Sequence, residues 1–446
     1  MDGPTKVSLL FVNQHYAPDV AATGQCLADL AEHLASDGYD VEVLASRTHY
    51  GPGHLDAPAR EVLNGVRVRR LAATGFGRGT HVGRLLDYAS FYVAVLLTLL
   101  VGRRYDGVVF LTTPPLIGLI GRVARAVRGQ RYAIWSMDLH PEAEIAAGML
   151  RERSLASRLL ARLDASAYRS ADFVVDLGSH MRQRVLQKGV SPARVHTVHV
   201  WGGRRDANVA RGVSPLARHL AIEDRFVVMY SGNAGIVHDF DAIFEAMREL
   251  RDDPRIFFLF VGGGPRRADV EAFAARERMK NFAYHDYFPR ELLSHSLSVA
   301  DVHLISLRHA FAGISVPSKL YGAMAAARPV LFVGPTACET ADAIREARCG
   351  VVVDPADGGA VPAGARLATV LRTWADVPAV AAVLGARGRH AFLERYEHRL
   401  GCAAFESVVQ AAWVYREQHE PRLTRTVRLR GGDARVTAVD PPAAAN

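Results

Sequence analysis

The sequence is poor in cysteine and has no long apolar run near its N-terminus, and each scarcity excludes a class of protein. Its four cysteines stand far apart with no C-x-x-C pair: Cys26, Cys338, Cys349 and Cys402. This spacing excludes a disulfide scaffold and the common zinc motifs, and it fits a reducing compartment. The apolar run 7–12 is too short for the core of a signal peptide, so we expect a cytoplasmic protein.

Lysine is scarce too, since only four of the 54 basic residues are lysine. The formal net charge is +8, yet twelve arginines and only three acids lie between Arg60 and Arg131. A surplus gathered on one segment indicates an anionic partner, either nucleic acid or a membrane surface. The sequence has no zinc-finger spacing and no basic motif interleaved with aromatic residues, so we expect a membrane surface and no nucleic acid.

Two passes of alternating strand and helix are visible in the apolar pattern of the chain. The expected strands are 6–13, 41–45, 66–71, 107–111, 132–135 and 173–176 in the first pass, and 226–230, 256–261, 282–284, 302–306, 330–333 and 351–353 in the second. Strands separated by helices predict parallel sheets with right-handed crossovers. The sequence thus predicts an α/β protein with two doubly wound, Rossmann-like domains facing a cleft.

The domain boundaries are expected where the composition changes. A first domain over 1–200 is followed by a glycine-containing linker over 201–222 and a second domain over 223–395. Apolar residues at positions 405, 408, 409, 412 and 413 form one helical stripe, which predicts a helix over 396–420. The tail 421–446 has no apolar period and is predicted to be disordered.

Candidate ligand-binding residues lie in loops that follow predicted strands, where open α/β sheets bind ligands. Gly24 lies near the start of the first helix, and glycine there lets backbone N–H groups approach a ligand. A plain strand–helix connection is the alternative, since no G-x-G-x-x-G follows the first strand. Small residues in two loops of the second domain can cradle phosphates. The candidates there are Gly232, Asn233, Gly235, Gly263 and Arg266.

The most specific stretch is 311–330, which reads as a loop, a helix, a tight turn and a strand. Pro317 suits a first helical turn, so the N–H groups of Ser318 and Lys319 are expected to point into the cleft. Ser315 and Val316 precede them and belong to the same candidate site. Lys319 is one of the rare lysines, and its compact ammonium would complement a diphosphate; the alternative is a surface lysine.

A D-x-D sequence, Asp239-Phe240-Asp241, is of a kind that can hold a divalent cation. It lies at the start of a predicted helix, where aspartate is a favoured N-cap. We therefore predict capping at this position and no metal site.

Together these motifs resemble family 4 glycosyltransferases of the GT-B fold, in the branch of capsule and colanic-acid fucosyltransferase-like proteins. The resemblance covers about residues 6–415. It rests on N-x-x-Y-x-P-D…T-G at 13–24, D-L-H-P-E at 138–142, S-G-N at 231–233, G-G-G-P at 262–265, V-P-S-K-L-Y at 316–321 and R-P-V at 328–330.

The resemblance implies transfer of a sugar from a UDP- or GDP-type nucleotide sugar, with retained anomeric configuration and without a metal or other cofactor. The nucleotide would lie on the C-terminal domain, and a polyprenyl-linked or glycan acceptor would enter from the N-terminal domain. The last helix would cross back to the first domain. The product would belong to cell-surface polysaccharide biosynthesis.

Two departures from the family pattern leave other functions open. Family members commonly carry two glutamates eight residues apart, of which the second binds the ribose, but Ile314 and Gly322 stand at these positions. Val237 and His238 stand where the family has a basic pair. A non-catalytic nucleotide-sugar-binding relative and a nucleotide-sugar epimerase are therefore the alternatives.

For catalysis, the matching motif points to Asp138 and His140, which follow the strand predicted at 132–135. A carboxylate or an imidazole at the carboxyl end of a strand could accept the proton of an acceptor hydroxyl or stabilise positive charge at the anomeric carbon. The alternatives are a helix cap for Asp138 and an exposed loop position for His140.

The segment 88–101 is apolar and is flanked by Arg84, Arg103 and Arg104. Its fourteen residues would span about 21 Å as a helix, less than the roughly 30 Å core of a bilayer, so it is not expected to be transmembrane. One alternative is a helix packed against the sheet. We favour the other, in which residues 84–104 lie on the inner face of the plasma membrane, within reach of a polyprenyl-linked acceptor.

Overall fold

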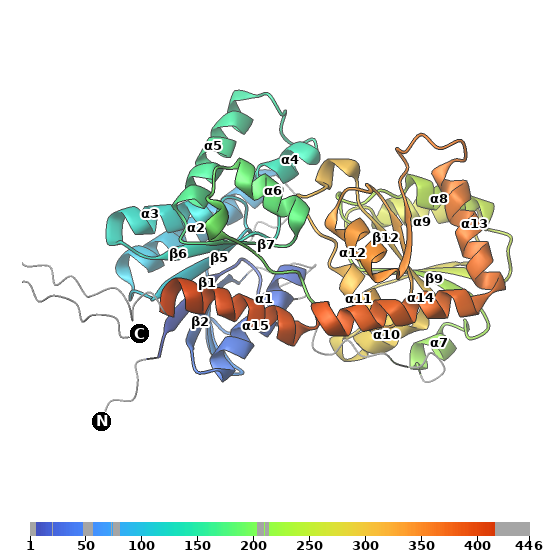
Figure 1. The fold of residues 1–446 in the computed structure, drawn as a ribbon, viewed down its shortest axis with the longest axis horizontal. Coiled ribbons are helices and arrows are strands. Elements are labelled where there is room, and N and C mark those ends of the chain that lie inside the picture. Colours follow the sequence, from blue (N-terminus) through green and yellow to red (C-terminus); the bar gives the residue numbers. More distant parts are fainter. Residues whose placement is uncertain are drawn as a thin grey trace, which may run out of the picture.

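The computed structural model describes residues 6–19, 21–47, 57–72, 74, 81–202, 209 and 214–414. Two α/β domains lie side by side, each with helices on both faces of a mostly parallel sheet (Figure 1). This confirms the predicted fold class.

The N-terminal sheet has the strand order β3-β4-β2-β1-β5-β6-β7-β8, and its neighbours are parallel except for the β3–β4 hairpin. Its strands are β1 (Ser8–Val12), β2 (Asp40–Ser46), β3 (Arg60–Leu63), β4 (Val66–Leu71), β5 (Gly107–Leu111), β6 (Tyr132–Trp135), β7 (Val174–Asp176) and β8 (Val195–Thr197). The six predicted strands are present. β3 and β8 were not predicted, because each is a short edge strand that lacks the continuous apolar run of a buried parallel strand.

The C-terminal sheet is parallel throughout, in the order β11-β10-β9-β12-β13-β14. Its strands are β9 (Phe226–Ser231), β10 (Ile256–Val261), β11 (Phe282–His285), β12 (Val302–Ser306), β13 (Val330–Val333) and β14 (Gly350–Val353). All six were predicted, because buried parallel strands read as short apolar runs rich in β-branched and aromatic residues.

The helices of the N-terminal domain divide between the two faces of its sheet (Figure 1). They are α1 (Ala22–Ser36), α2 (His81–Val101), α3 (Gly118–Arg128), α4 (Glu142–Ala146), α5 (Leu155–Ser170), α6 (Ser179–Gln187) and the 3₁₀ turn η1 (Pro192–Arg194). α3 packs between α2 and α5 on one face, and α1 packs against α15 on the other.

The remaining helices belong to the C-terminal half of the chain. They are α7 (Pro215–His219), which lies in the predicted linker, α8 (Asp241–Glu249), α9 (Arg267–Arg276), α10 (Leu293–Val299), α11 (Lys319–Ala325), α12 (Glu339–Ala347), α13 (Ala363–Asp376), α14 (Pro378–Ala391) and α15 (His398–Val409). Shorter turns are η3 (Arg290–Leu292), η4 (His309–Phe311), and the π-helical η5 (Phe392–Tyr396) and η6 (Gln410–Val414).

The last helix crosses back to the first domain, as the resemblance implied (Figure 1). The ring of Phe405 on α15 lies 4.8 Å from that of Trp135 and 6.5 Å from that of Phe11, centroid to centroid. Gly401 lies so close to Trp201 that a Cβ there would come within 2.3 Å of the indole. α15 begins at His398 rather than 396, and residues 415–446, which include the predicted tail, lie outside the described residues.

No single helix in the described ranges is long and apolar enough to cross a membrane. One pair, Ala363–Asp376 with Pro378–Val414, meets the length and composition criteria only when taken together, and it is bent by 101°.

Because Phe405 carries the apolar contact of the return helix, Phe405→Ala should lower the free energy of unfolding by about 3–4 kcal/mol. Leu400→Ala on the same helix is the matched control, since Leu400 is exposed and should cost less than about 0.5 kcal/mol. Urea denaturation followed by tryptophan fluorescence measures both. If the two substitutions lowered the free energy of unfolding equally, the proposed contribution of Phe405 to stability would be wrong.

Candidate active site

The two domains meet at the loops that follow β6 and β12. Asp138 pairs with Ser315 in an isolated antiparallel bridge, and the N–H of Leu139 donates to the carbonyl of Ile314 at 3.1 Å. The predicted catalytic loop of one domain is therefore in backbone contact with the predicted nucleotide loop of the other.

Side chains of neighbouring helices make further contacts between the domains. The N–H of Met181 on α6 donates to Glu339 Oε1 at the start of α12, at 2.7 Å. One turn further along α12, Asp342 Oδ2 lies 2.8 Å from His180 Nε2. The carboxyl ends of the two sheets are thus held facing each other, which is the arrangement in which a ligand can be bound between them.

Lys319, the first residue of α11, reaches back to the end of β9. Its Nζ donates to the hydroxyl of Tyr230 at 2.6 Å and to Nε2 of His238 at 3.3 Å. The same ammonium lies 3.8 Å from the centroid of the Tyr230 ring, a cation–π contact. Lys319 is half-buried at the cleft, so the alternative of a plain surface lysine is wrong.

The groups around Lys319 are neutral. Burial lowers the pKa of His238 well below its usual range, and its Nδ1 donates to Ser306 O at 2.5 Å, so Nε2 is the acceptor for Lys319. Burial raises the pKa of Tyr230 well above its usual value, and its hydroxyl donates to Asn233 O at 3.0 Å.

Loss of water also lowers the pKa of Lys319 well below its usual range. Within the described part of the chain, no carboxylate forms an ion pair with this ammonium. A cation that is withdrawn from water without a counter-ion is poised to bind an anion.

Glycines let two loops of the C-terminal domain stack beside Lys319. Gly232 has φ +122°, and a Cβ on it would lie 3.5 Å from Lys319 Cε. A Cβ on Gly262 would come within 2.2 Å of Gly232 O, and one on Gly264 within 2.6 Å of Ala234 O, both backbone atoms. Neither clash has room to relax, because both loops follow adjacent buried strands.

The other predicted glycines are placed differently. Gly235 is buried beside Asn233, and Gly263 is half-buried with Tyr287 as its nearest neighbour. Gly24 lies inside the first turn of α1, where a Cβ would meet His15 O at 3.0 Å. Close packing of the loop 13–16 on α1 thus accounts for Gly24 without a ligand.

A pocket of about 390 Å³ opens next to these loops, at the carboxyl ends of β9, β10 and β12. It is lined by Ile236, Asp239, Asp241, Arg266 and Arg308. Arg266 donates to His238 O at 3.3 Å, and Arg308 donates to Ile236 O at 3.4 Å. The sequence pointed to Arg266 but not to Arg308, because one arginine carries no signal in a chain where arginine is so common.

The D-x-D aspartates differ slightly from the prediction. The N-cap of α8 is Phe240, so neither aspartate is itself the N-cap residue. Asp239 Oδ1 instead accepts the N–H of Asp241, the first helical residue, at 3.0 Å. The bond still satisfies an N–H group of the helix start, as the capping prediction required.

Thr112 fixes the backbone of the loop that follows β6, which contains Asp138. Its hydroxyl oxygen accepts hydrogen bonds from the N–H groups of Met137 and Asp138 at 3.0 Å each. Asp138 does not cap a helix, because α4 begins at Glu142 and its N-cap is Pro141. The half-buried carboxylate therefore remains a candidate for chemistry at the domain contact.

His140 forms an ion pair within the same loop. Its Nδ1 lies 2.8 Å from Glu144 Oε1. Burial acts to lower the pKa of His140, but the hydrogen bond and charge of Glu144 outweigh it and raise the pKa. His140 is thus half-buried and favoured as an imidazolium, so the exposed-loop alternative is wrong and Asp138 is the better proton acceptor of the two.

Lys188, which the sequence analysis did not consider, anchors this loop. It is buried, and its Nζ donates to His140 O at 3.0 Å, Glu142 Oε1 at 2.7 Å and Asp164 Oδ2 at 2.8 Å. Lysine scarcity, the signal that marked Lys319, could have found it.

The loop before α11 also departs from expectation. Ser318 is the N-cap of α11, so Pro317 precedes the helix instead of lying in its first turn. Ser315 is half-buried, whereas Val316 and Ile314 are buried in the core between the domains. Ile314 and Gly322 offer no side-chain acceptor, in agreement with the departure seen in the sequence.

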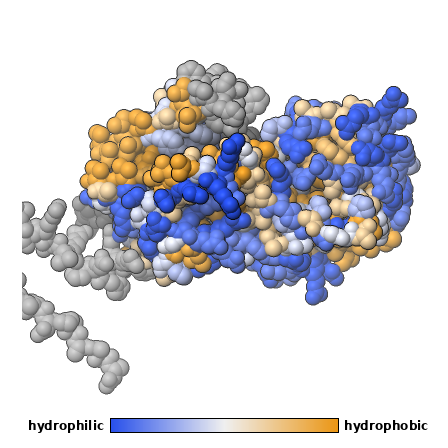
Figure 2. All heavy atoms as spheres, turned by 90° about the horizontal axis from the view of Figure 1, so that it is seen from above, coloured by the Kyte–Doolittle hydropathy of each residue, from blue (hydrophilic) through white to orange (hydrophobic). Residues whose placement is uncertain are grey.

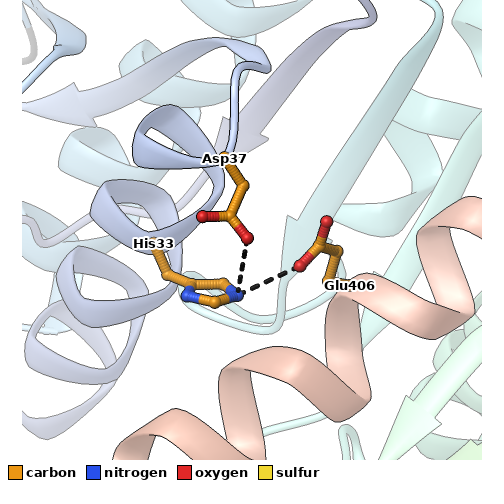
Figure 3. Close-up of side chains that lie close together, drawn as sticks. All are labelled: His33, Asp37 and Glu406. Atoms are coloured by element: carbon orange, nitrogen blue, oxygen red, sulfur yellow. Dashed lines mark hydrogen bonds and ion pairs between the residues drawn. The ribbon is translucent and has the colours of Figure 1, made fainter.

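Among the described residues, one group of histidine and carboxylate side chains is close enough to hold an ion: His33, Asp37 and Glu406 (Figure 3). His33 Nε2 lies 3.1 Å from Glu406 Oε2 and 3.7 Å from Asp37 Oδ2. The group joins the end of α1 to α15, so it connects the return helix to the first domain and lies outside the loops of the candidate site.

The glycosyl transferase 4-like domain family matches residues 22–201. Over 271 residues the chain is 28% identical to the probable glycosyltransferase WbjE of Pseudomonas aeruginosa, covering 60% of this chain and 67% of the relative. It is 25% identical over 386 residues to the putative colanic acid biosynthesis glycosyl transferase WcaI of Escherichia coli K12, covering 82% and 93%. The chain is therefore a glycosyltransferase, with a glycosyl transferase 4-like domain over residues 22–201.

Solved structures show the same fold. Sucrose-phosphate synthase from Thermosynechococcus elongatus superposes with a TM-score of 0.71 at 16% identity, covering 93% of this chain and 99% of that one. Anabaena Alr3699/HepE in complex with UDP and glucose superposes with a TM-score of 0.67 at 14% identity, covering 91% and 100%. Both neighbours support the GT-B fold of this glycosyltransferase.

Removing the uncompensated ammonium should weaken nucleotide binding. We expect Lys319→Met to lower the affinity for UDP or GDP, whichever the wild type binds, by about 10- to 100-fold. The thermal midpoint should not fall, because the substitution removes a poorly solvated charge. Isothermal titration calorimetry and calorimetric melting measure the two effects. Lys280→Met, at an exposed lysine of the same domain, is the matched control, and an unchanged dissociation constant for Lys319→Met would refute the role.

Proposed function

We propose that this glycosyltransferase moves a sugar from a nucleotide diphosphate sugar to a polyprenyl-linked or glycan acceptor in cell-surface polysaccharide synthesis. The observation that carries the proposal is the uncompensated Lys319 beside the bridge between Asp138 and Ser315. The likeness to a putative colanic acid glycosyl transferase supports the capsule and colanic-acid branch. The complex of Alr3699/HepE with UDP and glucose supports a nucleotide-sugar donor.

In the proposed complex, the donor diphosphate lies against the loops that follow β9 and β10. Lys319 supplies one positive charge, and Arg266 and Arg308 border the adjoining pocket. These arginines stand in for the basic pair whose usual positions hold Val237 and His238. Guanidinium groups bind phosphate oxygens bidentately, so the exchange preserves the required charge.

The transfer step forms a bond between the acceptor oxygen and the anomeric carbon and breaks the bond between that carbon and the donor phosphate oxygen. The diphosphate leaves with the electron pair, and Lys319 balances its charge. We assign Asp138 to accept the proton of the acceptor hydroxyl and to stabilise the positive charge that develops at the anomeric carbon. In the proposed reaction the configuration of that carbon is retained.

Glycosyl transfer is preferred to the two alternatives raised by the sequence. The family assignment supports an enzyme of this class over a binding protein. An epimerase acts on a free nucleotide sugar and needs no acceptor, so release of nucleotide that depends on an added acceptor separates the two. A panel of UDP- and GDP-sugars, incubated with a membrane extract as the source of acceptor, provides this test.

Asp138→Asn keeps the shape of the side chain and removes its charge, so turnover should fall by about 100-fold or more while nucleotide affinity is retained. Nucleotide release in the panel assay and calorimetric titration measure the two quantities. Asp172→Asn is a control within the same domain, because Asp172 pairs with Arg125 away from the cleft. If Asp138→Asn turned over at the wild-type rate, Asp138 would not be the group that accepts the proton of the acceptor hydroxyl.

We also propose that the reaction needs no metal ion, since Asp239 bonds to the start of α8 and shares its pocket with two arginines. Transfer should therefore persist in excess EDTA at more than about half of its untreated rate, because cationic side chains alone can neutralise a diphosphate. Loss of transfer in EDTA that manganese or magnesium restores would overturn this proposal.

A further inference from the structure

Helix α2 is apolar on two opposite sides. Phe91, Val95 and Leu99 are buried against the sheet at a spacing of four residues. Val93 and Leu97 lie on the other side and are 56% and 55% exposed. A surface helix of a globular protein ordinarily presents polar residues to solvent, so the outer side of α2 requires an explanation.

The two neighbouring helices continue this apolar surface. Val123 and Val127 are exposed on α3, and Leu155, Leu159 and Leu163 are exposed on α5, again at a spacing of four residues. α3 packs against both α2 and α5, so the three exposed stripes are adjacent. Figure 2, which looks down on this layer of helices, shows apolar residues gathered over the N-terminal domain. We call the outer side of α2, α3 and α5 the apolar face.

The charges on the apolar face have one sign. α2, α3 and α5 contain only two acids, Asp87 and Asp164, and both are buried. Exposed arginines lie among the apolar stripes, namely Arg122 on α3 and Arg158 and Arg162 on α5, whereas Arg125 is paired with Asp172. Arginine next to leucine on one helical side is the composition of segments that lie in a membrane interface, with the guanidinium groups at lipid phosphates.

We propose that the apolar face docks the enzyme on an anionic lipid bilayer. Its leucine and valine side chains enter the interface, and its arginines contact lipid phosphates. A second copy of the chain is a poorer occupant, because two such faces would bring their arginines together. The proposal deepens the proposed function, since the face belongs to the acceptor-side domain and a lipid-linked acceptor would be presented there, but docking itself does not depend on transfer.

The proposal also refines the expectation drawn from residues 84–104. The sequence placed the contact on one helix, whereas the structure adds α3 and α5 to it. It also shows that Phe91 belongs to the core, so only the outer residues can test docking without damaging the fold.

The test is flotation of the full chain with phosphatidylcholine vesicles, with and without 30% phosphatidylglycerol, at low and high salt. We expect wild type to float with the anionic vesicles, and to float less in high salt, because the arginine contribution is screened. Val93→Ser/Val127→Ser/Leu159→Ser, with one change on each helix, should reduce the bound fraction about tenfold or more. Arg158→Gln/Arg162→Gln should weaken anionic binding by about fivefold for each arginine.

Val380→Ser/Val383→Ser/Leu393→Ser is the matched control, since it removes the same side chains from exposed positions of the C-terminal domain. It should float like wild type. Melting curves show that each variant is folded. The proposal is overturned if wild type does not bind anionic vesicles. It is also overturned if the first triple variant binds them as well as wild type does. A wild-type dimer in light scattering that the first triple variant makes monomeric overturns it too, because the face would then be a self-association surface.

Transfer to a detergent-dispersed acceptor separates docking from the proposed function. The first triple variant should retain it, because none of its three positions lies in the candidate site. Retained transfer with no flotation of wild type would overturn docking alone. If wild type floats with the vesicles but transfers no sugar from any nucleotide sugar, the result would count against the proposed function alone.

Discussion

The contact between Asp138 and Ser315 is the interaction on which the arrangement of this enzyme depends. It joins the loop after β6 of one sheet to the loop before α11 of the other, so that both carboxyl edges border the same space. Thr112 and Lys188 hold the first loop from within its own domain. The return helix α15 completes the connection on the far side, because Phe405 joins the core of the first domain.

Charge is distributed in this enzyme according to what each region must bind. At the cleft, Lys319 is surrounded by neutral acceptors, and loss of water lowers its pKa. This arrangement suits the binding of an anionic ligand, because no carboxylate of the described residues pairs with Lys319. In the Asp138 loop, by contrast, His140 and Lys188 are matched by carboxylates, so their charges serve the structure of the loop. On the outer side of α3 and α5, arginines lie among apolar side chains, which suits a surface that is both anionic and apolar.

Local regularities of the chain were sufficient to predict most of the fold. Buried parallel strands are short apolar runs, and β5 and β6 were therefore placed with their observed bounds. The edge strand β3 was missed because half of each edge strand faces solvent and its sequence has no continuous apolar signal. The start of α11 reflects the same limit, because Pro317 was expected in its first turn but precedes the N-cap Ser318. A helix start depends on hydrogen bonds that sequence can place only to within a residue or two.

The sequence by itself determined the two parallel sheets, the loops that carry the candidate residues and the unusual lysine, because apolar period, glycine position and residue scarcity are local properties. Only the tertiary structure decided that Asp138 meets Ser315, that Lys319 has neutral partners, and that α2 is joined by α3 and α5 in one apolar face. These are relations between residues far apart in the chain. They exist because the crossovers and the return helix bring separate strand ends and helices together, which no local pattern records.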